Sequence, residues 1–378
     1  MDFYIKWKIK YKNTRLLFFA LALFSSCLRK EEKMYTETVE GMFDTVHIIS
    51  SYDKSEGEFK RKVELYKNEM ERLHKLYTIY EDIEGINNIK TINDNAGIRP
   101  VKVDADIIRL IKDSIKWNRE ISSKVDISAG KVIEEWEKAR KEGKVPSSEE
   151  LLKASECTGI DNIIINEKES TVFLKKKCTK INVGAVAKGY AAEIAADKME
   201  REGMTSFIIS AGGNVKAVGK RRFPKEETSD LKSCREEFCI GVTLPIYNDA
   251  DLDKENIYSK GKGKYLSKVS IKDMSVVTTG NYERYYIFEK RLYGHIIDLD
   301  LLKPGENFAS VTVITENSGF ADFMSTALFL LSYEEGKELL EKINRREKIE
   351  AIWAMKNGDI EVSKGLINGE NYVKYNFK

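Results

Sequence analysis

The sequence predicts an α+β fold with mixed helices and largely antiparallel strands. Stretches with apolar residues at helical spacing and short stretches rich in β-branched residues follow one another without regular βαβ alternation. Near the carboxyl end, Ile349–Met355 and Asp359–Val362 flank Lys356-Asn357-Gly358. An Asn-Gly pair between two such stretches is typical of a tight hairpin, in which neighbouring strands run antiparallel.

The remaining elements are expected in the following order. A strand is expected at 43–50, and a helix follows at 58–80. Further helices are expected at 104–121, 132–142, 191–202 and 320–331. Gly203 follows the third of these and is a plausible helix C-cap. Further strands are expected at 162–165, 171–174, 241–244, 269–278, 285–289 and 309–315. Residues 223–264 are rich in charge, and we interpret this region as a possible insertion.

The amino end predicts an exported bacterial lipoprotein, anchored to the membrane on its periplasmic side. Five basic residues precede the apolar segment 16–24, which is shorter than the roughly 20 residues of a membrane-spanning helix. Ser25-Ser26-Cys27 then resembles a relaxed lipobox, with Phe24 in place of leucine. Residues 1–26 would be the signal peptide, Cys27 the lipidated residue and 27–40 a solvated tether before the domain at 41–378. The alternative is a plain signal peptide with a chance cysteine.

Charge and cysteine content narrow the function classes. Residues 1–26 hold five basic residues and one acidic residue, so their removal changes the formal net charge from +2 to −2. A nearly neutral protein argues against nucleic acid as a partner. Four cysteines remain, and none forms a C-x-x-C pair. In an oxidising compartment Cys157 can pair with Cys178 and Cys234 with Cys239, while four free or buried thiols are about as good an interpretation.

Four polar segments carry the candidate chemistry. The first, Asn182-Val183-Gly184-Ala185-Val186-Ala187-Lys188-Gly189, places glycines and a lysine before a helical pattern. Backbone N–H groups and a cation at a helix N-terminus bind phosphate well. The others are Ala211-Gly212-Gly213-Asn214, the pair Thr278–Arg284 with His295–Asp298, and Ala321–Ala327. One such segment alone would mean little, but four in this order indicate a nucleotide and metal site assembled from distant parts of the chain.

Together with Phe43-Asp44-Thr45, Tyr80 and Val125-Asp126-Ile127-Ser128, these segments resemble the ApbE family of FAD:protein FMN transferases. The resemblance runs from about Gly41 to the carboxyl end. It implies an ApbE-like, T-fold-related domain with FAD in a cleft. It also implies that FMN moves from FAD to a threonine or serine hydroxyl of a target flavoprotein while AMP leaves. The implied acceptors are extracytoplasmic flavoproteins, such as subunits of sodium- or electron-transporting membrane complexes.

Mg²⁺ is the metal that this resemblance implies. Cleavage of a pyrophosphate requires concentrated negative charge to be neutralised, and Mg²⁺ prefers oxygen ligands. Asp322 and Thr326 are four residues apart on an expected helix, so their oxygens project from one face. The implied ligand set is Asp322, Ser325, Thr326 and the backbone carbonyl of Ala185. From the residues alone, polar side chains on an otherwise apolar helix are the simpler interpretation.

His295 is the candidate general base, with Asp298 orienting or assisting it. The transfer needs a base near the acceptor hydroxyl, and the resemblance places this segment at the active site. A lone histidine is more commonly structural, and that is the expectation for His47 and His74. The family's usual proline and threonine-glycine after the aspartate are replaced here by Leu299-Asp300-Leu301-Leu302, so this loop departs from the family pattern.

The resemblance also implies a set of FAD contacts. Phe43 and Tyr80 have rings that can stack on isoalloxazine or adenine, although a place in the core is the alternative for both. Lys188 is expected beside FAD, and the alternative is a surface lysine. Asn182 stands where the family commonly has aspartate. The other implied contacts are Lys124, Val125, Asp126, Gly213, Thr279, Gly280 and Ile296, the last through its backbone.

Two other functions fit the same residues. In a FAD pyrophosphatase, water would replace the acceptor hydroxyl and the products would be FMN and AMP. A non-catalytic FAD-binding lipoprotein would store or deliver FAD, but the presence of Asp322 and Thr326 favours metal chemistry. A zinc enzyme is disfavoured because the histidines and cysteines lack ligand spacing.

Overall fold

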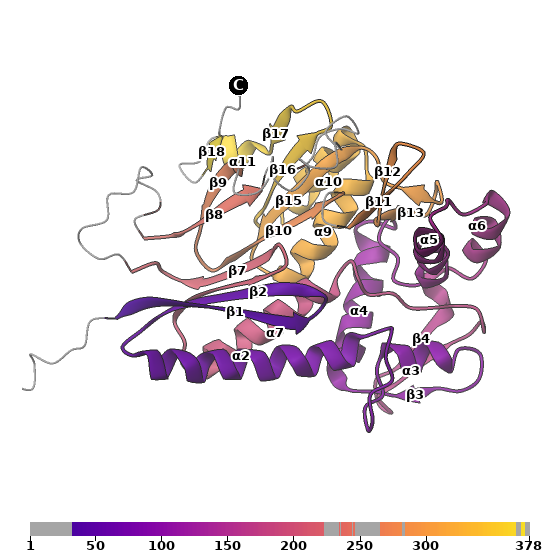
Figure 1. Cartoon of the computed structure of the whole chain (residues 1–378), viewed down its shortest axis with the longest axis horizontal. Coiled ribbons are helices and arrows are strands. Elements are labelled where there is room, and N and C mark those ends of the chain that lie inside the picture. Colours follow the sequence, from indigo (N-terminus) through magenta and orange to yellow (C-terminus); the bar gives the residue numbers. More distant parts are fainter. Residues whose placement is uncertain are drawn as a thin grey trace, which may run out of the picture.

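The centre of the fold is an eight-stranded sheet in which every neighbouring pair is antiparallel (Figure 1). The computed structural model describes residues 32–222, 234, 236–243, 245, 265–281, 284–367 and 372–374. In sheet order the strands are β1 (Lys33–Met42), β2 (Thr45–Asp53), β6 (Ser206–Ala211), β7 (Asn214–Gly219), β10 (Met274–Gly280), β15 (Phe308–Thr315), β16 (Ile349–Met355) and β17 (Ile360–Val362). The α+β class predicted from the sequence is therefore confirmed.

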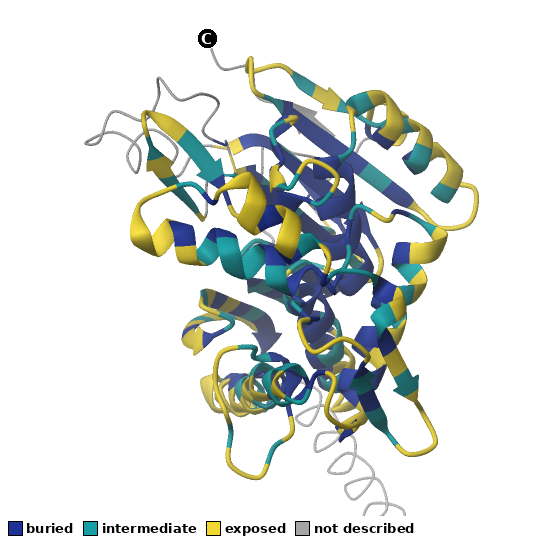
Figure 2. Cartoon of the chain, turned by 90° about the vertical axis from the view of Figure 1, so that its right-hand side faces the viewer, coloured by how far each residue is buried: buried dark blue, intermediate teal, exposed yellow. Residues whose placement is uncertain are grey.

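Three helices cover one face of this sheet: α2 (Glu56–Tyr77), α7 (Ala187–Arg201) and α9 (Ser318–Leu330). Helix α9 is buried along its whole length and packs on β10 and β15, which explains its almost wholly apolar sequence. Its first N–H groups are capped by Asn317, whose Oδ1 accepts from the N–H of Phe320 at 2.8 Å. Figure 2 shows the buried residues gathered between the sheet and these helices. Asp322, Ser325 and Thr326 are thereby held inside the main core.

A small second sheet covers the opposite face. It consists of β18 (Tyr372–Lys374), β9 (Tyr265–Ile271) and β8 (Phe238–Thr243), in that order. Phe238, Ile240 and Val242 are buried against Val276 and Ile352 of the large sheet. The possible insertion at 223–264 therefore includes a strand that belongs to the core. The strand expected at 241–244 is confirmed, and it begins earlier.

The other elements lie around one end of the large sheet, on the right of Figure 1. The helices are α3 (Ile89–Asp94), α4 (Ala105–Glu120), α5 (Gly130–Glu142), α6 (Ser148–Ser155) and the 3₁₀ turn Ile160–Asn162. The strands are β3 (Val101–Lys102), β4 (Ile163–Asn166), β5 (Thr171–Leu174), β11 (Tyr285–Phe288), β12 (Arg291–Gly294), β13 (Ile297–Asp298) and β14 (Lys303–Pro304). Two further helices, α10 (Tyr333–Ile343) and α11 (Lys364–Ile367), pack on β16.

Several expected boundaries were wrong, and turns explain most of them. Residues 269–278 form two strands, because the chain reverses at Lys272–Asp273 with a φ of 53° at Asp273. Helix α2 ends at Tyr77 because Thr78 is extended, so Tyr80 lies beyond it. The expected tether at 27–40 overlaps strand β1, which begins at Lys33. The signal peptide and Cys27 lie outside the described residues.

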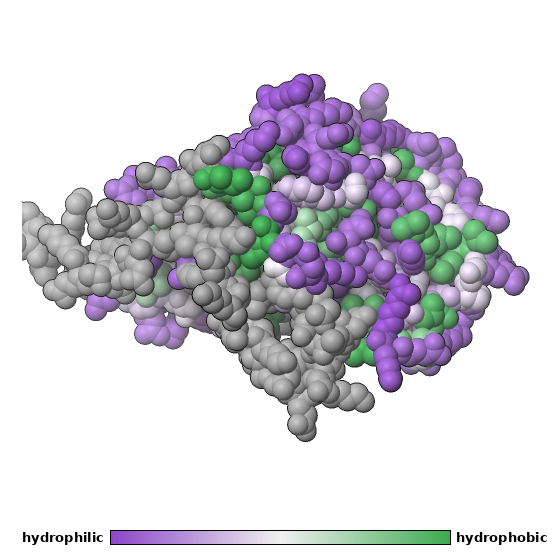
Figure 3. Space-filling model, turned by 90° about the horizontal axis from the view of Figure 1, so that it is seen from above, coloured by the Kyte–Doolittle hydropathy of each residue, from purple (hydrophilic) through white to green (hydrophobic). Residues whose placement is uncertain are grey.

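The cysteines and the surface add two facts. Cys157 is bonded to Cys178, and Cys234 to Cys239, so the disulfide alternative holds for both pairs. Figure 3 shows a mostly hydrophilic surface on the described part of the face seen from above, with small separate hydrophobic patches. Within the described ranges, no helix has both the length and the apolar character needed to cross a membrane.

A buried ion pair fixes α7 and α9 relative to the sheet, and its removal should destabilise the fold. Lys216 of β7 lies 3.0 Å from Glu193 of α7 and donates to the carbonyl of Glu316 at 2.8 Å. The other oxygen of Glu193 accepts from the N–H of Ser318 at the start of α9. We expect Lys216→Met to lower the free energy of unfolding by about 3 kcal/mol, because Glu193 would remain buried without its partner.

Denaturant titration followed by circular dichroism measures this change. The matched control is Lys337→Met, whose pair with Glu334 is exposed and should contribute less than about 1 kcal/mol. Equal effects of the two substitutions would show that the Lys216 pair does not hold the helices.

Candidate active site

A cluster of side-chain oxygens joins α9 to β10. The hydroxyl of Thr279 lies 2.7 Å from that of Ser325 and 3.4 Å from that of Thr326. Asp322 is one turn away on the same helix, and the Ser325 hydroxyl donates to its carbonyl at 3.0 Å. All four side chains are buried. The structure therefore brings together three expected metal ligands and Thr279, an expected FAD contact.

The amino end of α7 faces this cluster. The N–H of Gly189 donates to Oδ2 of Asp322 at 2.9 Å, and no larger residue fits at position 189, since a Cβ there would lie 2.2 Å from the carbonyl oxygen of Ser318. In a continued helix this N–H would bond to the carbonyl of Ala185. Because it is directed at Asp322, that carbonyl lacks its usual donor in the described part of the chain. Ala185 is thus placed before α7 with a carbonyl available for a ligand.

Burial raises the pKa of Asp322, while the Lys188 ammonium, the Gly189 N–H and the amide of Asn214 lower it. The Asn214 amide acts at a distance, since its Nδ2 is buried and makes no hydrogen bond in the structure. A buried carboxylate surrounded by donors and hydroxyls is a place where a further positive charge would be stabilised.

Lys188 is the cation of the site. It is half-buried, and among the described residues it makes no ion pair and no hydrogen bond. Its charge lowers the pKa of both Asp322 and His295, so it lies within electrostatic range of the two. An unpaired, partly desolvated ammonium between these groups is suited to binding an anion.

His295 lies in a recess with one ring nitrogen fixed. Its side chain is exposed to solvent, yet desolvation by the surrounding protein and then the Lys188 charge lower its pKa to about 4. Accessibility and desolvation agree if the ring is at the base of a cleft. Nδ1 lies 3.0 Å from the carbonyl oxygen of Arg284, which can only accept, so Nδ1 carries the proton. Nε2 of the neutral ring is then an unprotonated base.

Removal of the Lys188 charge should raise the pKa of His295. We expect the pKa in Lys188→Met to move from about 4 toward the ordinary value of 6.5, because a nearby positive charge disfavours the imidazolium. The measurement is a proton NMR titration of the histidine ring signals, and the chain has only three histidines. An unchanged titration would place Lys188 away from His295.

The turn between β1 and β2 forms another part of the cleft. Phe43 and Asp44 both have a φ of 51°, which is unfavourable for residues other than glycine, and their carbonyls accept from the Arg284 guanidinium at 3.5 and 3.3 Å. The Phe43 ring packs against His74, whose Nδ1 accepts from the Phe43 N–H at 3.2 Å. Tyr80 is exposed and donates to Glu137 of α5 at 3.0 Å. Burial and then Glu137 raise the pKa of Tyr80 to about 12.

Two segments before α5 and α7 run side by side. The N–H of Asn182 donates to the carbonyl of Ile127 at 2.8 Å, and the N–H of Gly130 donates to the carbonyl of Lys180 at 3.0 Å. Val125 is buried, and burial raises the pKa of the neighbouring Asp126. The predicted contacts Val125, Asp126 and Asn182 therefore lie on adjoining backbone.

Asp298 does not orient His295 as expected. It is buried and lies 2.9 Å from the ammonium of Lys124, which also pairs with Asp300 at 2.7 Å. The group that fixes the His295 ring is the Arg284 carbonyl. Ile296 is buried and its carbonyl accepts from Gly305 at 2.9 Å, so a backbone contact to a ligand falls to its N–H. Gly213, with a φ of 87°, turns the chain from β6 into β7 before Asn214, and Gly280 ends β10 beyond Thr279.

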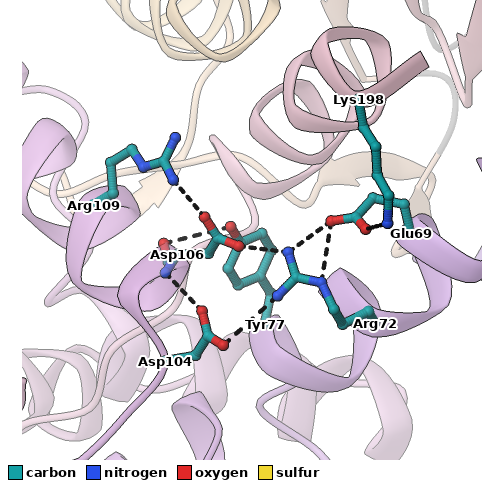
Figure 4. Close-up of polar contacts among 7 residues, drawn as sticks. All are labelled: Glu69, Arg72, Tyr77, Asp104, Asp106, Arg109 and Lys198. Atoms are coloured by element: carbon teal, nitrogen blue, oxygen red, sulfur yellow. Dashed lines mark hydrogen bonds and ion pairs between the residues drawn. The ribbon is translucent and has the colours of Figure 1, made fainter. Parts of the chain in front are cut away.

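A separate polar recess of about 420 Å³ lies between α2, α4 and α7 (Figure 4). None of the predicted site residues lines it. Arg72 pairs with Glu69 and Asp106, Arg109 with Asp106, and Lys198 with Glu69. Burial alone would raise the pKa of Glu69, but Arg72 and Lys198 outweigh this and lower it. These ion pairs join three helices, and we do not assign them to the site.

The residues present fit Mg²⁺. The donors near Asp322 are one carboxylate, hydroxyls and a free carbonyl, all of them hard oxygen ligands. In the described part of the chain, no group of three or more histidine, cysteine or acidic side chains is placed to hold a metal. The site would therefore depend on hydroxyl, carbonyl and substrate oxygens around one carboxylate, which suits Mg²⁺ and does not suit zinc.

Sequence reasoning missed the partners that fix the site. Arg284 was part of a quoted motif without a role, and Asn214 was noted only as the end of a glycine turn. Glu137 gave no signal because it is one of many charged residues on α5. Each acts through a contact between segments more than fifty residues apart in the chain.

An antiparallel α+β fold whose cleft combines buried oxygens, an unpaired lysine and a histidine base defines a class of proteins that can act on a phosphate-containing ligand. The model of the ApbE family matches residues 43–353, and the chain belongs to that family. Its relatives include the FAD:protein FMN transferase of Klebsiella pneumoniae, 28% identical over 297 residues, covering 77% of this chain and 84% of the relative. The FAD:protein FMN transferase of Escherichia coli K12 is 25% identical over 363 residues, covering 92% and 93%.

Solved structures agree in fold. The ApbE protein of Thermotoga maritima has a TM-score of 0.73 at 24% identity, covering 90% of this chain and all of its own. The flavinyl transferase ApbE of Pseudomonas stutzeri has a TM-score of 0.69 at 19% identity, covering 88% and 96%. The ApbE-like fold expected from the sequence is confirmed.

Proposed function

We propose that this protein is a Mg²⁺-dependent FAD:protein FMN transferase that moves FMN from FAD to a threonine or serine hydroxyl and releases AMP. The observation that carries the proposal is Lys188, which lacks an ionic partner in the described part of the chain and acts electrostatically on both His295 and Asp322. A dinucleotide pyrophosphate is an anion of suitable charge for such a place. The names of the relatives support the choice of FAD.

The residues of the chain divide the reaction between them. Nε2 of His295 takes the proton of the acceptor hydroxyl, whose oxygen attacks the phosphorus on the FMN side of the pyrophosphate. A new oxygen–phosphorus bond forms, the bond to the bridging oxygen breaks, and AMP leaves with that oxygen. Lys188 neutralises the phosphate charge that increases during the attack. The Arg284 carbonyl keeps Nδ1 protonated and so keeps Nε2 free.

Asp322, Ser325, Thr326 and the Ala185 carbonyl are the residues that would hold Mg²⁺. When bound, the ion would draw charge from the pyrophosphate oxygens. Phe43 and Tyr80 are placed at the turn and beside α5, where they can pack on the rings of FAD. The remaining FAD contacts follow from the adjoining segments around Val125, Asp126 and Asn182.

One assay separates the three candidate functions. The purified protein is incubated with FAD, Mg²⁺ and an acceptor domain bearing a target threonine, and the products are measured by mass spectrometry. An FMN adduct on the acceptor supports the transferase. Free FMN and AMP with no adduct would indicate a pyrophosphatase, and intact FAD would indicate a carrier. The exposed, desolvated His295 favours the first two, because a carrier needs no base.

We further propose that the protein is an exported lipoprotein held at the periplasmic side of the membrane through Cys27, where it meets extracytoplasmic acceptor flavoproteins. The order of basic, apolar and small residues before Cys27 supports this. The test is palmitate labelling and fractionation of wild-type and Cys27→Ser proteins. Labelled wild type in the membrane fraction and unlabelled Cys27→Ser are expected. Equal labelling of both would rule out Cys27 as the anchor.

A further inference from the structure

The disulfide between Cys157 and Cys178 lies directly behind the paired segments of the cleft. Thr179 follows Cys178, and its hydroxyl donates to the carbonyl of Cys157 at 2.8 Å. The next residue, Lys180, accepts from Gly130 at 3.0 Å. The disulfide therefore joins the loop after α6 to the segment that leads into α7 and Lys188.

A second route runs from Cys157 to the other segment. The N–H of Gly159 donates to the hydroxyl of Ser128 at 2.7 Å, and the N–H of Ser128 donates to Oδ1 of Asp126 at 2.7 Å. Two residues earlier, Lys124 pairs with Asp298 on the strand that follows His295. One covalent bond thus holds both segments, of which one leads to Lys188 and the other is tied to the strand beside His295.

The packing between the two segments leaves little room for rearrangement. A Cβ on Gly130 would lie 2.6 Å from the carbonyl oxygen of Lys180, so the two backbones are in close contact. Cys157 is 6% exposed, whereas Cys178 lies at the surface. The bond is accordingly reachable by a soluble reductant while its other half is fixed in the protein.

We propose that the Cys157–Cys178 disulfide is a positioning element of the cleft, which preorganises the 125–130 and 179–184 segments for FAD and makes FAD binding depend on an oxidising compartment. This rests on the proposed function only in taking FAD as the ligand. A dithiol supplies two electrons and two protons, yielding two cysteine thiols and the oxidised dithiol. The segments then lose their shared anchor, and ligand binding has to order them.

The chain offers a matched control. Cys234 and Cys239 form the other disulfide, and Cys239 belongs to β8 on the opposite face of the large sheet from α7 and α9. We expect Cys157→Ser/Cys178→Ser to raise both the Kd for FAD, measured by flavin fluorescence quenching, and the KM for FAD about tenfold, with kcat within about twofold. Cys234→Ser/Cys239→Ser should leave the Kd for FAD unchanged.

Reduction of the wild-type protein provides the same test without substitution, in case the double variant does not fold. Dithiothreitol is added stepwise, alkylation and mass spectrometry report which disulfide has opened, and circular dichroism reports folding. The Kd should rise when Cys157–Cys178 opens in folded protein and recover on reoxidation. An unchanged Kd after that opening would overturn the positioning role alone. Oxidised protein that binds FAD but transfers no FMN would overturn the proposed function alone, and protein that binds no FAD would overturn both.

Discussion

Replacement of Asp322 by asparagine should abolish most FMN transfer, by at least about 100-fold, because the only carboxylate of the oxygen cluster would be lost. The side chain keeps its shape, so the hydrogen bond from the Gly189 N–H and the buried packing of α9 should survive. The measurement is the rate of FMN adduct formation over a range of Mg²⁺ concentrations. Higher Mg²⁺ should restore the rate only in part, since a neutral amide is a weaker ligand.

The control for this substitution is Asp359→Asn in the exposed turn between β16 and β17, where the carboxylate meets only Asn357. It should transfer FMN at the wild-type rate. Thermal unfolding of both variants shows whether a lost rate reflects a lost fold. An Asp322→Asn enzyme with wild-type rate and metal dependence would contradict the assignment of this cluster.

Replacement of His295 by glutamine should lower kcat by about 100- to 10,000-fold, the usual contribution of a general base. The Kd for FAD should change little, because Nδ1 is used in a hydrogen bond to the Arg284 carbonyl and Nε2 is directed at the acceptor. Single-turnover transfer and fluorescence binding separate the two quantities. A kcat reduced by less than tenfold would show that another group takes the proton.

The same base predicts the pH dependence of transfer. With a pKa of about 4, His295 is neutral at pH 7 and remains so well below it, so the rate should fall only at distinctly acidic pH. Protonation removes the Nε2 lone pair and therefore lowers the rate. In Lys188→Met the acid limb should move to higher pH, in parallel with the pKa measured by NMR.

The sequence was sufficient for the fold class and for the elements with strong patterns. Helix α9 and the β16–β17 hairpin could be predicted, because local spacing and the Asn-Gly turn determine them. The turn at Phe43 and Asp44 was missed, since positive φ values at an aromatic residue and an aspartate result from tertiary contacts with Arg284 and His74. The core strand β8 was hidden because its neighbours are rich in charge.

The candidate site was predictable in its members and less so in its pairings. Asp322, Ser325 and Thr326 share a helix face, so their proximity follows from local structure. The pair of Lys124 with Asp298 joins residues 174 apart in the chain, and no local pattern favours it over a contact of Asp298 with His295. Which carbonyl fixes the His295 ring likewise depends on how β11 and β12 fold back on each other.

The central claim is that distant segments meet to place a pyrophosphate between Lys188 and the oxygens around Asp322. A crystal structure of the protein with FAD and Mg²⁺ tests it most directly. The account predicts both phosphates within contact of Lys188, the metal on Asp322 and Thr326, and His295 Nε2 facing the FMN phosphorus. Phosphates bound instead in the polar recess lined by Arg72, Arg109 and Lys198 would contradict it.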